Sequence, residues 1–159
     1  MALVVSLLFA WLIIHAAAAL PRKLPLPVNV LLFMAILIMN SNRLTVLSHN
    51  LELFELSMHR PTAVAIVIYR DVTYPLTLIC FANTAIETGR RTAKWATAAA
   101  AILYLYGIEQ SLRGLGAIRY DEWNIFYEGL LNAAMLAIAY GIALALRALW
   151  RKERIGHES

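Results

Sequence analysis

The feature that most constrains this chain is a series of five apolar runs, each near or above the ~20 residues that a helix needs to cross a bilayer. These runs occupy about residues 3–20, 27–47, 62–86, 92–112 and 124–150. Because a bilayer core offers no water to backbone amides, each run is expected to be helical. The sequence therefore predicts an all-α fold, a single polytopic transmembrane helix bundle of about five spans over residues 1–159, with a basic cytoplasmic tail at 151–159.

The composition agrees with a membrane location and argues against a nucleic-acid-binding role. Hydrophobic residues make up 61% of the chain and charged residues 15%, against roughly 45–50% and about 25% in an ordinary soluble domain. The net charge of +4 is carried by short loops and the tail, where membrane topology places basic residues. We therefore expect membrane lipids, and no nucleic acid, around these charges.

The basic residues are distributed unevenly between the two sides of the predicted membrane. One side carries Arg22, Lys23, Arg90, Arg91, Lys94, Arg147, Arg151, Lys152 and Arg154. The other side carries Arg43, Arg60, Arg113 and Arg119. Because cytoplasmic loops are enriched in lysine and arginine, the N-terminus is predicted outside and the C-terminus inside. An odd number of spans agrees with this orientation.

The boundary between the second and third spans is open. Residues 44–58 could extend the second helix, or they could form a separate amphipathic helix along the membrane interface. Pro61 follows this stretch and is well placed for the first turn of the third helix.

Arg70 and Asp71 lie near the middle of the third run, at 62–86. Each charge at bilayer depth costs ~2.5–3.5 kcal/mol on insertion scales, so such residues usually face a protein interior or a wet cavity. On a helix these neighbours should point about 100° apart, and each is expected to need a partner elsewhere. Pro75 removes one backbone N–H and should free a carbonyl near Asp71.

Candidate partners for this charged pair lie on other spans. Glu109, in the outer part of the fourth run, is a candidate partner of Arg70. Amide side chains are further candidates, although buried amides in membrane bundles often crosslink helices instead. They are Asn40, Asn42, Asn83 and Asn132.

A polar face continues along the third span from Arg70 to Glu87 in steps of three and four residues. Its intervening members are Thr73, Thr77, Cys80 and Thr84. Such spacing is typical of a packed helix seam. The face could line a pathway or a binding groove, or it could be a helix–helix interface joined by hydroxyl groups.

The fifth run carries small residues at strict four-residue spacing. They are Gly129, Ala133, Ala137, Gly141 and Ala145. Such a stripe lets two helix backbones approach closely. It predicts a packing face, whose partner could be internal, near residues 98–101, or another subunit.

No catalytic or cofactor-binding pattern is visible in the sequence. It contains no nucleophile–base pair, phosphate loop or dinucleotide fingerprint. Cys80 is the single cysteine, and no Cys/His cluster has zinc spacing. We therefore predict no enzymatic activity, no metal and no cofactor.

The segment YRDVTYPLTLICFANTA, from Tyr69 to Ala85, resembles the central motif of a family of small multi-span integral membrane proteins. That family has no established activity and is common in spore-forming Gram-positive bacteria, the Bacillus/Clostridium group. A second match joins Ile108-Glu109, AIRY at 117–120, Trp123 and Tyr127. The match covers roughly residues 40–143.

This resemblance implies four or five helices and a bacterial cytoplasmic membrane, with the spore inner membrane as a specific location. The family motifs also mark candidate key positions in this chain, two of which (Tyr120 and Trp123) would lie on an outer loop. The positions are Asp71, Tyr74, Pro75, Glu109, Tyr120 and Trp123. The family has other residues where this chain has Arg70.

Three functions remain open. The first is a non-catalytic membrane component that acts by helix–helix association, as an accessory subunit or a homo-oligomer. The alternative is a small transporter or channel-like protein whose working groups are the charges Arg70, Asp71, Glu87 and Glu109. An enzyme acting on lipids or quinones ranks last, because nothing in the sequence forms a nucleophile or a redox centre.

Overall fold

The computed structural model describes residues 1–20, 23–46, 54–56, 60–87, 90–120 and 125–157. Helix α1 comprises Ala2–Ala19, and α2 comprises Leu26–Thr45. Helix α3 (Arg60–Ile68) continues through a π-helical turn, η2 (Tyr69–Thr73), into α4 (Tyr74–Glu87). Helices α5 and α6 comprise Arg91–Gly114 and Ile125–His157. The all-α prediction is confirmed, with one short two-stranded addition.

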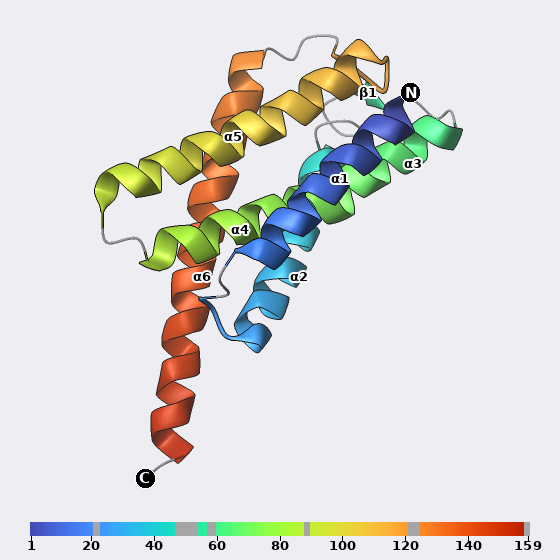
Figure 1. Ribbon diagram of the computed structural model, residues 1–159. Helices are drawn as coiled ribbons and strands as arrows, with labels where there is room; N and C mark the ends of the chain where they lie inside the picture. Colours follow the sequence, from blue (N-terminus) through green and yellow to red (C-terminus); the bar gives the residue numbers. More distant parts are fainter. Residues whose placement is uncertain (21–22, 47–53, 57–59, 88–89, 121–124, 158–159) are drawn as a thin grey trace.

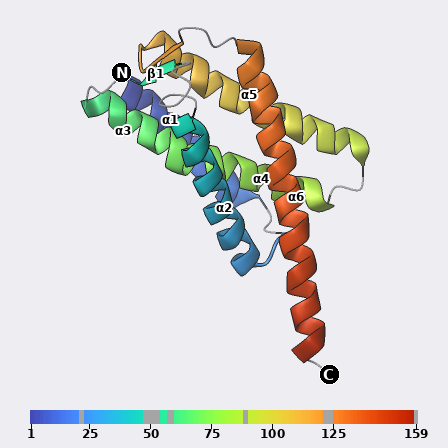
Figure 2. The same cartoon turned by 180° about the vertical axis from the view of Figure 1, so that it is seen from behind.

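The continuous helix α3–η2–α4 is the centre of the bundle. Its α3 part lies alongside α1, and its α4 part packs against α1, α2, α5 and α6 (Figure 1). Seen from behind, α2 and α6 cross this helix at a steep angle (Figure 2). The C-terminal part of α6 extends past the other helices in both views. The centre of the bundle therefore lies where α2, α4, α5 and α6 meet.

Four helices are long and apolar enough to cross a membrane. They comprise Ala2–Ala19, Leu26–Arg43, Pro61–Ile86 and Phe126–Glu153. The fourth predicted span, at 92–112, is helical as α5 but does not belong to this set, since residues such as Lys94, Glu109 and Gln110 lower its apolarity. The described chain is thus consistent with a small multi-pass membrane protein, and the five-span count and the orientation stay predictions.

Two boundaries differ from the sequence prediction. Helix α2 ends at Thr45, and Phe54–Leu56 form strand β1, so this described part of 44–58 is neither a helical extension nor an interfacial helix. Strand β1 pairs antiparallel with β2 (Ile118–Tyr120), because the two connections meet at one end of the bundle and can satisfy each other's backbone groups. Helix α6 also continues past residue 150, through the basic tail to His157.

Helix α5 ends in a glycine motif that directs the chain into β2. The Gly116 N–H donates to the Arg113 carbonyl, and the Ala117 N–H donates to the Leu112 carbonyl, each at 2.9 Å. Gly116 has a φ of 71°, a conformation that costs glycine little because it has no Cβ.

The π-helical turn determines which side chains of the central helix enter the core. Ala65 and Tyr69 are buried four residues apart, whereas the next buried ring, Tyr74, follows after five. In a regular α-helix a five-residue step would point the second ring away from the first. The wider turn keeps both rings inside, edge to face with centroids 5.9 Å apart. Leu78 then continues this buried face.

Candidate functional site

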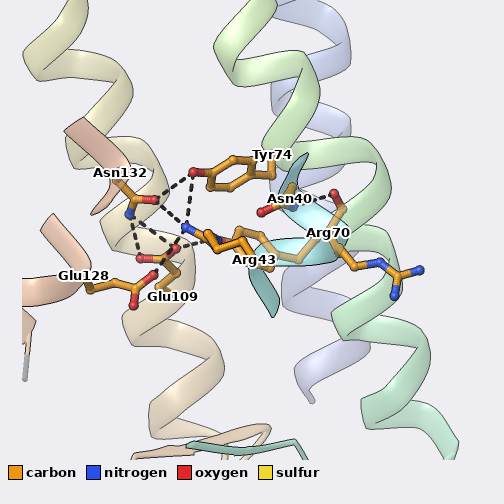
Figure 3. Close-up of polar contacts among 8 residues, drawn as sticks. Asn40, Arg43, Arg70, Tyr74, Glu109, Glu128 and Asn132 are labelled. Carbon is orange, nitrogen blue, oxygen red and sulfur yellow. Dashed lines mark hydrogen bonds and ion pairs between the residues drawn. The ribbon is translucent and has the colours of Figure 1, made fainter. Parts of the chain in front are cut away.

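A buried cluster of polar side chains joins four helices where α2, η2–α4, α5 and α6 meet (Figure 3). We call this cluster the charged centre. Its members are Arg43, Tyr69, Tyr74, Glu109, Glu128 and Asn132. Two of them, Arg43 and Glu128, lie only one turn from the ends of α2 and α6. The centre is therefore nearer to the β1–β2 end of the bundle than to its middle.

Arg43 is the only cation of the charged centre, and its side chain is 7% exposed. Its Nη1 donates to the Tyr74 hydroxyl at 3.2 Å and to Asn132 Oδ1 at 3.1 Å. The same nitrogen lies 3.7 Å from Glu128 Oε1. The guanidinium carbon also lies 4.6 Å from the centroid of the Tyr74 ring, within the range of a cation–π contact. One guanidinium thus connects α2 to both α4 and α6.

Glu109 is the most deeply buried carboxylate of the centre, with 1% of its surface exposed. The Tyr69 hydroxyl donates to Oε1. Asn132 Nδ2 donates to both carboxylate oxygens, at 3.3 and 3.1 Å, while Asn132 Oδ1 accepts from Tyr74 at 3.0 Å. Both ends of the Asn132 amide are therefore used, which fixes its orientation.

The charge of this centre is unbalanced. Two carboxylates, Glu109 and Glu128, share one guanidinium, and both carboxylates are at most 5% exposed. With both acids ionised, the six members together carry a net charge of −1, and Glu128 makes at least one further interaction besides the contact with Arg43. One proton or one small cation would restore neutrality.

Arg70 and Asp71 lie outside the charged centre, and the prediction that they do not face each other is wrong. Arg70 Nε and Nη2 donate to the Asp71 carboxylate at 2.5 and 2.7 Å, because the long arginine side chain folds back onto its neighbour. The two side chains are 36% and 28% exposed. Figure 3 shows the Arg70 side chain pointing away from the centre. Glu109 is therefore not the partner of Arg70, since Tyr69 and Asn132 bind it.

Asn40 and Pro75 together explain the π-helical turn. The Tyr74 N–H bonds to the Tyr69 carbonyl, five residues back. The next bond of this kind would join residue 75 to the Arg70 carbonyl, but proline has no N–H. Asn40 Nδ2 donates to that carbonyl instead, at 3.0 Å. The carbonyl that Pro75 leaves without a backbone donor is thus that of Arg70, next to Asp71 as predicted, and an amide from α2 satisfies it.

The remaining polar candidates mostly make structural contacts. Asn83 Oδ1 accepts from the backbone N–H groups of Lys23 and Leu24 at 3.1 and 3.0 Å, which holds the α1–α2 connection against α4. On the polar face of the third span, Thr77 and Thr84 donate to carbonyls of their own helix at 2.7 and 2.8 Å. These bonds lie within one helix, and Thr77, Cys80 and Thr84 line a groove of about 250 Å³, so both interpretations of this face stay predictions.

Three of the predicted positions cannot be placed in the site. Trp123 and the side chains of Glu87 and Tyr120 lie outside the residues that the structure describes. Tyr74 does belong to the charged centre, and Pro75 follows it directly.

The C-terminal part of the small-residue stripe of α6 is not the face that packs inside the chain, whereas Ala133 and Ala137 line a groove together with Ala98 of α5. The inner face of α6 contains Glu128, Asn132 and Ala139, all at most 5% exposed. Of the stripe, Ala137, Gly141 and Ala145 are exposed. A Cβ placed on Gly141 would meet no atom within 4 Å. An internal partner near residues 98–101 is thus not observed for the C-terminal part of the stripe.

Sequence reasoning missed Arg43 and Glu128, because Arg43 was assigned to one side of the membrane and Glu128 was not considered. A usable signal was present in their spacing. Glu128 and Asn132 are four residues apart and so share one face of a helix, as Asn40 and Arg43 do at three. In each pair an amide side chain and a charged side chain lie on the same face of one helix, and such a face is suited to polar contacts with a neighbouring helix.

No family model matches the chain, and comparisons with curated proteins and with solved structures found no match. The resemblance of residues 69–85 to a membrane protein family therefore stays a prediction. Among the residues that the structure describes, no three His, Cys, Asp or Glu side chains lie together as a metal site would require. The functional argument consequently depends on the geometry of this chain alone.

Proposed function

We propose that the protein is a non-catalytic component of a membrane that acts by helix–helix association through α6, as a homo-oligomer or an accessory subunit. The observation that supports this proposal is the outward position of Ala137, Gly141 and Ala145. Ala134 and Ala148 are also exposed, and each lies seven residues from Gly141, on the same face of α6. We call these five residues the α6 outer face.

Small residues favour association in a bilayer for a physical reason. Lipid tails are as apolar as leucine, so helices associate through close backbone packing rather than through the hydrophobic effect. The α6 outer face lets a second helix approach closely, and the space around Gly141 is open. The charged centre supports this role because Glu128 and Asn132 hold the opposite face of α6 against the bundle.

The test is the assembly state of Gly141→Leu, with Gly107→Leu as a matched control on α5. A Cβ at Gly107 also meets no atom within 4 Å, so both variants add the same side chain in open space. Native mass spectrometry in mild detergent should show a defined oligomer or a stoichiometric complex that only Gly141→Leu dissociates. A monomeric wild type, or an unchanged mass in Gly141→Leu, would reject the proposal.

The two buried carboxylates of the charged centre favour a second candidate, a small transporter or channel-like protein that binds a proton or cation. Its working groups would then be Arg43, Glu109 and Glu128, with the partly buried Arg70–Asp71 pair in a lesser role. Liposomes containing the protein should show proton or cation flux that Glu109→Gln abolishes. Wild-type flux equal to that of empty liposomes would eliminate this candidate.

We also propose the bacterial cytoplasmic membrane as the location, with the N-terminus outside and the C-terminus inside. The bias of nine basic residues against four supports this orientation, which requires α5 to cross the membrane as well. Reporter fusions that are active on only one side of the membrane should then place the two termini on opposite sides. Both termini on the same side would indicate that only the four apolar helices cross.

A further inference from the structure

A groove of about 390 Å³ lies between α4, α5 and α6, away from the charged centre. Arg91, Lys94 and Tyr140 line one end of it. Phe81 and Ile102 line the apolar remainder. A basic end that opens onto an apolar channel is complementary to an amphiphile with an anionic head.

The basic end has charge available for a ligand. Lys94 Nζ donates to the Tyr140 hydroxyl at 3.3 Å, which positions the ammonium group at the groove. Among the side chains that the structure describes, no carboxylate pairs with Lys94 or with the exposed Arg91. Helix α5 begins at Arg91, so its first backbone N–H groups and the positive end of its dipole lie at the same place.

The length of the groove fits one acyl chain. Eleven residues of α5 separate Arg91 from Ile102, or about 16 Å at 1.5 Å per residue. A single leaflet is about half of the ~30 Å hydrocarbon core. Trp95 also lines the basic end and is 67% exposed, as expected for an aromatic side chain at the level of the headgroups.

We propose that this groove binds an anionic phospholipid. The phosphate lies against Arg91, Lys94 and the start of α5, and one acyl chain lies along Phe81 and Ile102. Charge selects the headgroup, because a zwitterionic lipid of the same chain length fills the apolar channel equally well but presents no net charge to the two basic side chains. This groove shares no residue with the charged centre, and it shares one residue, Ala137, with the α6 outer face.

The experiment compares lipid retention by the full chain in two lipids with identical acyl chains, phosphatidylglycerol and phosphatidylcholine. Native mass spectrometry should show preferential retention of phosphatidylglycerol. Each basic residue near a membrane surface contributes about fivefold to such a preference, so Arg91→Gln/Lys94→Gln should lower it about 30-fold. The matched control is Arg151→Gln/Lys152→Gln, which removes the same charge from exposed positions of α6 outside the groove and should keep the preference.

A second variant tests the acyl part of the site. Ala98 lines the groove between its two ends, and Ala98→Phe should narrow the channel and release phosphatidylglycerol while both basic residues remain. Helicity by circular dichroism monitors the fold of each variant. Equal retention of the two lipids by the wild type, an unchanged preference in the Arg91/Lys94 variant, or displacement of the lipid by inorganic phosphate alone would overturn the proposal.

Discussion

Replacing Arg43 with glutamine should destabilise the fold far more than replacing either carboxylate of the charged centre. The change removes the hydrogen bonds to Tyr74 and Asn132 and the ion pair with Glu128. It leaves two buried carboxylates without a cation among the members of the centre. Removing one partner of a buried pair costs about 3–5 kcal/mol, and two lost hydrogen bonds to a charged group give a similar figure at about 1.5–3 kcal/mol each.

Glu128→Gln has the opposite effect on the charge balance. It leaves one guanidinium for one carboxylate, Glu109, and so removes the excess negative charge while it weakens one ion pair. We expect a loss of about 1 kcal/mol or less in the free energy of unfolding. The double variant Arg43→Gln/Glu128→Gln should be more stable than the sum of the two single changes predicts, because the two residues interact directly.

The assay is thermal unfolding in detergent, followed by the fluorescence of the four tryptophans. For a chain of this size, 3–5 kcal/mol corresponds to about 6–20 °C in Tm. Arg70→Gln is the control, since the Arg70 side chain is 36% exposed and pairs, within the described part of the chain, only with its neighbour Asp71, and it should lower Tm by about 4 °C at most. A Tm drop for Arg43→Gln no larger than that for Glu128→Gln would refute the reasoning.

Two further predictions concern single backbone positions. Asn40→Ala should lower the free energy of unfolding by about 1–3 kcal/mol, because the Arg70 carbonyl loses its hydrogen-bond donor. Adding Pro75→Ala to this variant should recover part of the loss, since alanine restores a backbone N–H; no recovery would contradict this account of the π-helical turn. Gly116→Ala should lower the free energy of unfolding by about 1 kcal/mol, because Gly116 has a positive φ that alanine adopts poorly. The control Gly114→Ala, within α5, should be neutral or stabilising. Equal effects of the two changes in the same assay would show that the end of α5 does not depend on Gly116.

The sequence predicted the helices well because apolarity and length are local properties. Each of the five predicted runs contains a long helix, and the third occupies one continuous helix around Arg70 and Asp71. The sequence also named Pro75 and Glu109, since polar or helix-breaking residues within an apolar run are conspicuous, and it named Tyr74 through the resemblance to a membrane protein family. The sequence overestimated the functional importance of Arg70. A charge in the middle of an apolar run indicates a cost of insertion into the membrane, but it does not indicate whether a neighbouring side chain already neutralises that charge.

By itself, the sequence determined that this is an all-helical chain with several spans of membrane length, because the bilayer imposes that choice on any long apolar run. Only the tertiary structure decided which charges meet. Arg43 is separated from Glu109 and Glu128 by more than sixty residues, and nothing in the sequence connects the three until four helices bring them together. The orientation of α6, with its small residues outward, was likewise decided by packing, since Glu128 and Asn132 are held at the charged centre on its opposite face.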